Sequence, residues 1–344
     1  MQPALAAAAL SAWRPDAPED FVVDEIPLYP ASGEGAHTFV RVEKRDVTTE
    51  EVARALARAA GVPPRDVGYA GRKDRRAIAR QWLSAPGLDP ARALELALPR
   101  ARVLEAVRHP HKLRTGHLRA NAFVISIRGA GETRAARAEE RLADFARRGF
   151  PNRFGAQRFG HAGDNAARGA AVLAGRERVR DRREARFLVS ALQAAVFNEV
   201  LARRALPLDA LELGDVARVE ASGGLFVVED LAREAPRAAA FEISATGPIF
   251  GTHDVAPRGE PARREREALA AHGIDPDAPL AAPRGVPLHG ARRPLRARIE
   301  GAAITRSGDA LELRVTLPPG SYATVLVEEL LREEDDSAGL GGLP

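Results

Sequence analysis

A single carboxylate, Asp74, lies in the middle of a strongly basic segment at residues 68–77. Four cations flank it closely in the sequence: Arg72, Lys73, Arg75 and Arg76. Neighbouring positive charges favour the ionised form of an aspartate, so we expect them to lower the pKa of the Asp74 carboxyl. An ionised carboxylate can act as a nucleophile or as a general base. A cluster of surface ion pairs between two strands would have the same composition.

The same cations would attract a polyanion and bring its backbone over the carboxylate. A second mixed segment, residues 152–160, contains Arg153, Arg158 and two phenylalanines. Arginines and aromatic rings at close spacing suit contact with nucleic acid, and they suit a packed turn between domains equally well. Both interpretations of this second segment stay open.

Asn121 and Phe123 lie two residues apart at the start of an alternating stretch. The two-residue period of a strand places both side chains on one face. An amide that reads the edge of a base, next to a ring that stacks on it, is what recognition of an RNA base requires. A buried phenylalanine at the start of a core strand is the alternative explanation. Phe21, which leads into another predicted strand, is a second aromatic of this kind.

The elements that must hold these residues alternate irregularly between strands and helices. Alternating patterns predict strands over residues 21–26, 37–44, 67–70, 79–85, 103–109, 121–128, 295–299 and 311–317. Thr48 and Glu51 form a capping box that opens a helix, and Gly61 ends it. Amphipathic patterns predict longer helices over 132–148, 184–204 and 322–332. This order predicts an α+β fold.

The character of the sequence changes after residue 150, where loops rich in glycine and arginine begin. Strand patterns return at residue 295. We therefore predict a second globular unit over residues 151–294. Its last part, residues 256–294, is rich in Pro, Gly and Ala, which suits loops around one short helix.

The chain has 344 residues, with 51 Lys and Arg against 47 Asp and Glu. That surplus is too small to indicate a nucleic-acid partner by itself, but the charge is segregated. Residues 72–80 carry five basic residues and one acid, and residues 176–186 carry six arginines and three acids. Segregation of this kind is typical of a phosphate-binding face, although solvated helix faces rich in arginine give the same pattern.

Cysteine is absent, which excludes a disulfide scaffold and a thiolate metal site and fits a reducing compartment. No Lys or Arg precedes the apolar residues 3–10, so we expect a tail or short helix there and not a signal peptide. No stretch approaches the roughly 20 apolar residues of a membrane span. Phosphate-loop, dinucleotide-binding and zinc-protease motifs are also absent. We predict a cytoplasmic protein with no membrane association, no cofactor and no metal.

Six sequence blocks, in the same order, resemble the TruD family of transfer-RNA pseudouridine synthases over residues 18–331. They are residues 18–21, 70–75, 121–123, 151–160, 197–198 and 317–324. The resemblance implies a pseudouridine synthase catalytic domain with a mainly antiparallel sheet, formed by residues 1–150 and 295–344. A TruD-type α+β insertion domain over 151–294 would interrupt it. The implied partner is transfer RNA, and we expect a monomer. Six cations would contact this RNA: Arg72, Lys73, Arg75, Arg76, Arg153 and Arg158.

Matching the blocks residue by residue assigns family roles to positions of this chain. Asp74 corresponds to the catalytic aspartate, and Asn121 to an active-site asparagine. The base-stacking aromatics correspond to Phe21 and Phe123. Tyr322 falls where the family has an aromatic near the site.

This chain departs from the family pattern at one position. The family often has a lysine six residues before the first phenylalanine, where it pairs with the aspartate. Here that position is Pro15. We expect the neighbouring Arg14 to supply the positive charge.

The implied reaction breaks the glycosidic bond of uridine, rotates the freed uracil and rejoins it through its C5 carbon. Asp74 would attack the ribose or abstract one of its protons, and both routes stay open. The family points to uridine 13 in the D-arm of transfer RNA. Two alternatives are a pseudouridine synthase for another RNA and a non-catalytic protein that binds structured RNA.

Overall fold

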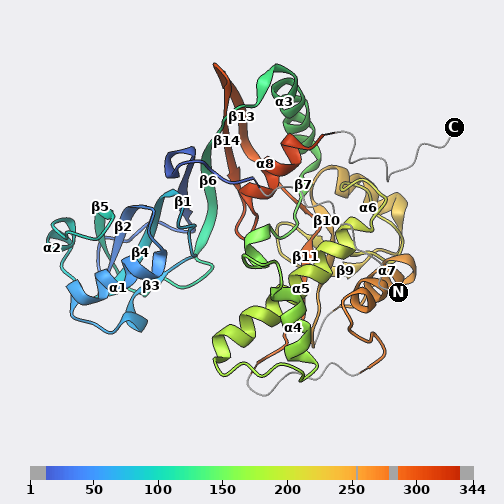
Figure 1. The fold of residues 1–344 in the computed structure, drawn as a ribbon, viewed down its shortest axis with the longest axis horizontal. Coiled ribbons are helices and arrows are strands. Elements are labelled where there is room, and N and C mark those ends of the chain that lie inside the picture. The colour runs from blue at the N-terminus through green and yellow to red at the C-terminus, as the bar shows by residue number, and fades with distance from the viewer. Residues whose placement is uncertain (1–12, 253–254, 279–285, 334–344) are drawn as a thin grey trace. The chain divides into compact units, whose positions relative to one another are not determined.

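The structure, a computed structural model, describes residues 13–252, 255–278 and 286–333. The predicted tail or short helix over residues 3–10 lies outside this part of the chain. Two compact units form, which we describe separately (Figure 1). The N-terminal unit combines Trp13–Ala143 with Ile299–Gly320, and the central unit combines Asp144–Arg298 with Ser321–Pro344 as far as these ranges are described.

One eight-stranded sheet forms the frame of the N-terminal unit. Its strands follow the order β13-β14-β6-β1-β4-β2-β5, and β3 pairs with β4. Their bounds are β1 (Phe21–Pro27), β2 (His37–Arg45), β3 (Gly68–Tyr69), β4 (Ile78–Pro86), β5 (Ala101–His109), β6 (Leu118–Ile127), β13 (Glu300–Ser307) and β14 (Ala310–Leu317). The pairing of β1 with β4 is parallel, and the other pairings in this sheet are antiparallel. The beginnings of β1 and β4 therefore lie at the same end of the sheet.

Helix α1 (Thr49–Ala60) begins where the capping box predicts, and it packs against one face of this sheet. The hydroxyl of Thr48 accepts a hydrogen bond from the backbone N–H of Glu51, and Gly61 ends the helix with a left-handed φ of 68°. Val52 and Leu56 are fully or nearly fully buried in the core under β2 and β4. This face of the sheet is therefore closed by apolar packing. The unit also contains α2 (Pro90–Leu94) and the first part of α3 (Gly131–Arg148).

A smaller four-stranded sheet with the order β11-β10-β8-β9 lies in the central unit. Its strands are β8 (Val216–Val219), β9 (Leu225–Val227), β10 (Ile243–Ile249) and β11 (Ala291–Pro294). The long helix α5 (Arg182–Ala202) packs against β10. The other helices are α4 (Asn165–Leu173), α6 (Leu231–Ala239), α7 (Gly259–Ala271) and α8 (Ala323–Leu331), and β7 (Phe150–Pro151) pairs with β12 (Arg296–Ala297).

The mixed α+β fold with a mainly antiparallel sheet is confirmed. The described residues of the segment 256–294 are more regular than predicted, because β11 adds to the sheet of the central unit through hydrogen bonds that composition does not reveal. The strand predicted over 295–299 is reduced to β12. Residues 321–333 group with the central unit, whereas the predicted catalytic domain included them. The assignment of catalytic and insertion domains stays a prediction, because compactness does not define function.

Helix α5 is long and apolar enough to cross a membrane by length and composition. More than half of its apolar window is buried inside the protein, as in the core helix of a soluble protein. Among the described residues it is the one helix that meets these criteria.

Candidate active site in the N-terminal unit

The loop that carries Asp74 connects β3 to β4, and a buried lysine binds its backbone. Lys44, on β2, has no exposed surface. Its Nζ donates a hydrogen bond of 2.6 Å to the backbone carbonyl oxygen of Asp74 and one of 2.7 Å to that of Val47. One ammonium group thus ties the loop to the turn that follows β2.

A second set of contacts fixes the residue before the aspartate. The backbone N–H of Lys73 donates to Thr49 Oγ1 at 3.0 Å, and this hydroxyl donates to Gln81 Oε1 at 2.9 Å. Both polar side chains are buried. The ammonium group of Lys73 forms an ion pair with Glu25 on β1, where the two side chains are 6% and 1% exposed. Four elements, β1, β2, β4 and α1, therefore position the loop.

The Asp74 side chain itself is exposed. Nearby protein atoms nevertheless remove part of its hydration. Burial raises the pKa of the Asp74 carboxyl, and the positive charges of Lys44 and Lys73 oppose this rise. The predicted net lowering of this pKa is therefore wrong in direction, because burial outweighs the cations. Burial likewise lowers the pKa of the Lys44 ammonium to about 8, against the opposing charge of Asp74.

Asn121 lies on β6, directly opposite Glu25 of β1. Residues directly opposite in an antiparallel pair share a face of the sheet. Asn121 is thus a neighbour of the Glu25 carboxylate that holds Lys73. Within the described part of the chain, Asn121 Oδ1 is buried and has no hydrogen-bond partner. Buried acceptors of this kind are rare and usually have a partner that is supplied from elsewhere.

Phe21 and Phe123 lie further along the same two strands and contact each other. Their ring centroids are 5.6 Å apart in an edge-to-face arrangement, and Trp13 lies 6.2 Å from Phe21. The two phenylalanines are 4% and 8% exposed. Because the rings touch, they form one aromatic surface and not two plates with space for a base between them. Asn121 and Phe123 share one face of β6, as predicted from the two-residue period.

The predicted cations of the N-terminal unit have different environments. Arg72, Arg75 and Arg76 are exposed, and the first two pair with Glu50 and Asp46. They remain candidates for RNA contact. Lys73 does not, because its buried ammonium group is committed to Glu25. Arg14 is exposed. Among the described residues, the positive charges that act on the pKa of Asp74 are those of Lys44 and Lys73, and Arg14 is not one of them.

The remaining predicted residues belong to the central unit. Tyr322 lies just before α8 and packs against Phe154, with ring centroids 5.9 Å apart. Arg153 donates to the carboxylates of Glu328 and Glu329 and is 21% exposed, so these two acids already occupy its guanidinium group. Arg158 donates to Ser190 Oγ and stays a candidate for RNA contact.

Two charged residues of this site, Lys44 and Glu25, were not predicted. The sequence does contain a pattern that indicates them. The alternation of inward residues at Val40 and Val42 continues to Lys44, and that at Phe21 and Val23 continues to Glu25. A charged residue at an inward position needs a buried partner. The described residues contain no group of three or more His, Asp or Glu side chains placed to hold a metal ion.

The fold places the chain in a known structural class. It matches the crystal structure of a protein assigned as tRNA pseudouridine synthase D (TruD) in Methanosarcina mazei, with a TM-score of 0.72. The match covers 92% of this chain and 93% of that chain. Sequence identity is 22%, so this comparison concerns the fold alone.

Sequence comparisons then give the family. The model of the tRNA pseudouridine synthase D (TruD) family matches residues 15–178 and 178–330. The chain is 46% identical to a tRNA pseudouridine synthase D of Anaeromyxobacter sp. (strain Fw109-5), over 92% of this chain and 91% of that protein. It is 39% identical to one from Geobacter metallireducens, over 91% and 93%. The chain belongs to the TruD family, whose members are isomerases.

Proposed function

We propose that this protein converts uridine to pseudouridine in transfer RNA, with uridine 13 of the D-arm as its target and Asp74 as the catalytic carboxylate. The role of Asp74 rests on one observation, namely the way in which its loop is fixed. Lys44 and the Thr49–Gln81 pair fix the backbone of the loop, while the carboxylate stays accessible. A reacting group held in this way loses little entropy when the substrate arrives.

The reaction requires one bond exchange at the ribose C1′. The bond from C1′ to N1 of uracil breaks, the base turns, and a bond from C1′ to C5 forms. N1 gains a proton and C5 loses one, so the product is an isomer of the substrate. Asp74 acts on the ribose as a nucleophile or as a base in this scheme. The uridine must leave its stack, because a protein side chain cannot reach the sugar and the base together inside a helix.

The uracil would find two complementary groups on β1 and β6. Asn121 Oδ1, buried and without a protein partner in the described part of the chain, would accept a hydrogen bond from an N–H of the base. The rings of Phe21 and Phe123 are 4% and 8% exposed, so they would stack on its face after the residues that cover them have shifted. Stacking contributes about 1–3 kcal/mol per base, which offsets much of the cost of unstacking. Tyr322 and Arg14 stay further proposed contacts of the substrate.

Tritium release tests this proposal. A tRNA transcript labelled with tritium at C5 of its uridines should lose label in proportion to the pseudouridine formed. We expect release from a transcript with uridine at position 13 and none when that position is cytidine. Release that persists with cytidine would move the target to another nucleotide. A folded wild-type protein that binds tRNA without any release would instead support the non-catalytic alternative.

The pH dependence of catalysis tests the role of Lys44. Asp74 acts in its ionised form, so activity falls as the pH drops below its pKa. Lys44 lowers that pKa, and its removal raises it. In a Lys44→Met variant the acid side of the pH profile of kcat/KM should therefore move toward neutral pH, whereas Lys44→Arg should keep it nearer to wild type. A profile that does not move in a Lys44→Met protein shown to be folded would contradict this role.

A further inference from the structure

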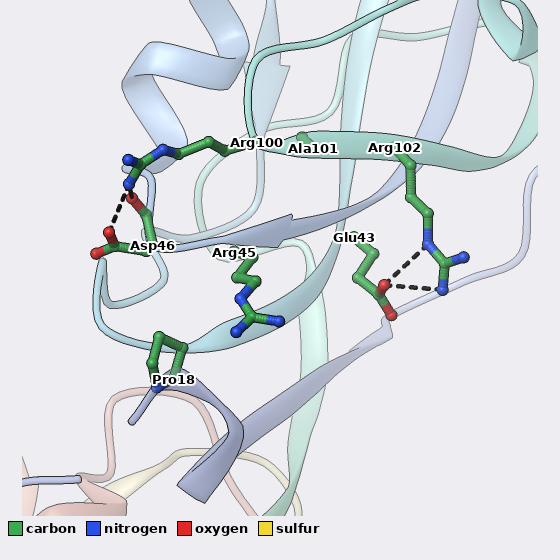
Figure 2. A pocket seen from close by; sticks show the side chains of 7 residues that line it. All are labelled: Pro18, Glu43, Arg45, Asp46, Arg100, Ala101 and Arg102. Atoms are coloured by element: carbon green, nitrogen blue, oxygen red, sulfur yellow. Dashed lines mark hydrogen bonds and ion pairs between the residues drawn. The ribbon is translucent and has the colours of Figure 1, made fainter. Parts of the chain in front are cut away.

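A cavity of the N-terminal unit lies at the end of β2 and the start of β5 and has a volume of about 550 Å³. This volume is within the range of roughly 300–1,000 Å³ typical of small-molecule sites. Its lining consists of Pro18, Glu43, Arg45, Asp46, Arg100, Ala101 and Arg102. Figure 2 shows Arg45 between the Asp46–Arg100 pair and the Glu43–Arg102 pair, with Pro18 facing its guanidinium end. The cavity therefore combines apolar surfaces with charged groups.

Positive charge is in excess around this cavity. Each lining carboxylate is shared, since Glu43 binds Arg80 and Arg102, and Asp46 binds Arg75 and Arg100. Three separate groups of ion pairs surround the cavity, and together they contain six arginines and four carboxylates: Arg41, Arg80 and Arg102 with Asp24 and Glu43, Arg45 with Glu19, and Arg75 and Arg100 with Asp46. The first and the third group each have one more arginine than carboxylates.

The guanidinium groups that face the cavity are open to solvent. The side chains of Arg45 and Arg100 are each 60% exposed, and that of Arg102 is 70% exposed. Ion pairs at such exposure contribute only about 0–1 kcal/mol. A phosphate group can therefore join or replace the carboxylates at little cost. Arginine suits this role because its planar guanidinium binds phosphate through two parallel hydrogen bonds.

The backbone at the cavity is strained. Among the described residues, three non-glycine residues have a positive φ, and two of them, Asp46 at 46° and Arg100 at 52°, line this cavity. A left-handed conformation costs about 1–2 kcal/mol for most residues but less for an aspartate, so the strain lies mainly at Arg100. Arg100 Nη1 holds the pair together by donating to the carbonyl oxygen of Asp46 at 3.2 Å and to its carboxylate at 2.5 Å. Strained residues cluster at functional sites more often than elsewhere.

The cavity shares its wall with the Asp74 loop. The backbone N–H of Asp46 donates to the carbonyl oxygen of Ala77 at 3.3 Å, and the carboxylate of Asp46 lies 3.7 Å from Arg75. Lys44 binds the carbonyl oxygen of Val47 on the same turn. The turn after β2 thus forms the cavity on one side and supports the loop on the other.

We propose that this cavity is a second RNA subsite, which binds one unpaired nucleotide of the same transfer RNA, distinct from the uridine at Asp74. Its phosphate binds Arg45 and Arg102, and its base lies against Pro18 and the aliphatic part of the arginines. This inference rests on the proposed function for the identity of the RNA. The binding of base and phosphate together explains why the lining combines apolar surface with guanidinium groups.

A pair of matched double variants tests the subsite. Arg45→Ala/Arg102→Ala removes two cavity charges, and Arg65→Ala/Arg92→Ala removes two exposed arginines elsewhere in the same unit. The probe is the full-length tRNA transcript, with its Kd measured across a series of salt concentrations. We expect the cavity variant to weaken binding by about 10-fold or more. The negative slope of the logarithm of the binding constant against the logarithm of the salt concentration should become less steep, by about 0.7–0.9 for each phosphate contact that is lost. The control variant should stay within about twofold of wild type.

Turnover distinguishes this proposal from the proposed function. In the cavity variant, kcat at saturating tRNA should stay within about twofold of wild type while KM rises. Equal weakening in both double variants, or an unchanged Kd in a folded cavity variant, would overturn the subsite and leave the proposed function intact. Loss of kcat with unchanged KM would also overturn it, because the arginines would then act only on the loop. A wild-type protein without tritium release would overturn the proposed function alone, since the binding comparison needs no turnover.

Discussion

An Asp74→Asn variant should release tritium from C5-labelled tRNA at least about 10³-fold more slowly than wild type. The amide has nearly the shape of the carboxylate but can act neither as a base nor as a nucleophile. Lys44 binds the backbone carbonyl of residue 74 and not its side chain, so the loop should keep its position. The measurement is single-turnover tritium release at saturating enzyme, which separates chemistry from binding.

Binding of tRNA provides the control for this variant. Its Kd should stay within about threefold of wild type, because one carboxylate contributes little to phosphate contact. Asp74→Glu keeps the charge and moves it by one methylene, and we expect an intermediate rate because the geometry of the reacting groups matters strongly. Wild-type turnover by a pure Asp74→Asn protein would remove the basis of the proposed mechanism.

A Lys73→Met variant should lower the free energy of unfolding by about 3–5 kcal/mol. The ammonium group of Lys73 neutralises Glu25, whose side chain is 1% exposed and also accepts a hydrogen bond from the backbone N–H of Trp82. Removal of one partner leaves the other charge buried and unpaired, which is costly in a medium of low polarity. Urea unfolding followed by circular dichroism measures the change.

The neighbouring residue supplies a matched control. Arg72 pairs with Glu50, but its side chain is 73% exposed, so Arg72→Met should cost no more than about 1 kcal/mol. Replacing both members of the buried pair, in Lys73→Met/Glu25→Leu, should recover most of the lost stability. Similar losses from Lys73→Met and Arg72→Met would show that burial does not set the strength of the Lys73–Glu25 pair.

Local patterns predicted most of the N-terminal unit. Alternation over 21–26 and 37–44 corresponds to β1 and β2, and the capping box of Thr48 and Glu51 begins α1. Residues that are close together in the sequence determine these elements, so the elements can be predicted without knowledge of tertiary contacts. The shorter strands β11 and β12 were not predicted correctly, because their pairing with distant segments determines them.

The site was harder to predict than the fold. The sequence around Asp74 indicates a carboxylate among cations, but it does not say which cation is buried. Lys73 pairs with Glu25, 48 residues away, whereas Arg72 remains exposed. The pKa of Asp74 depended on burial, which composition does not determine. Arg14 was expected from its place in the sequence, whereas the structure gives that electrostatic role to Lys44 and Lys73.

The contacts that hold the Asp74 loop come from residues 25, 44, 49 and 81, each on a different element. None of these elements can fix the loop alone, and long-range pairings of this kind form slowly, because distant segments of the chain must first meet. The reactive carboxylate should therefore reach its working position late in folding, after the sheet has assembled.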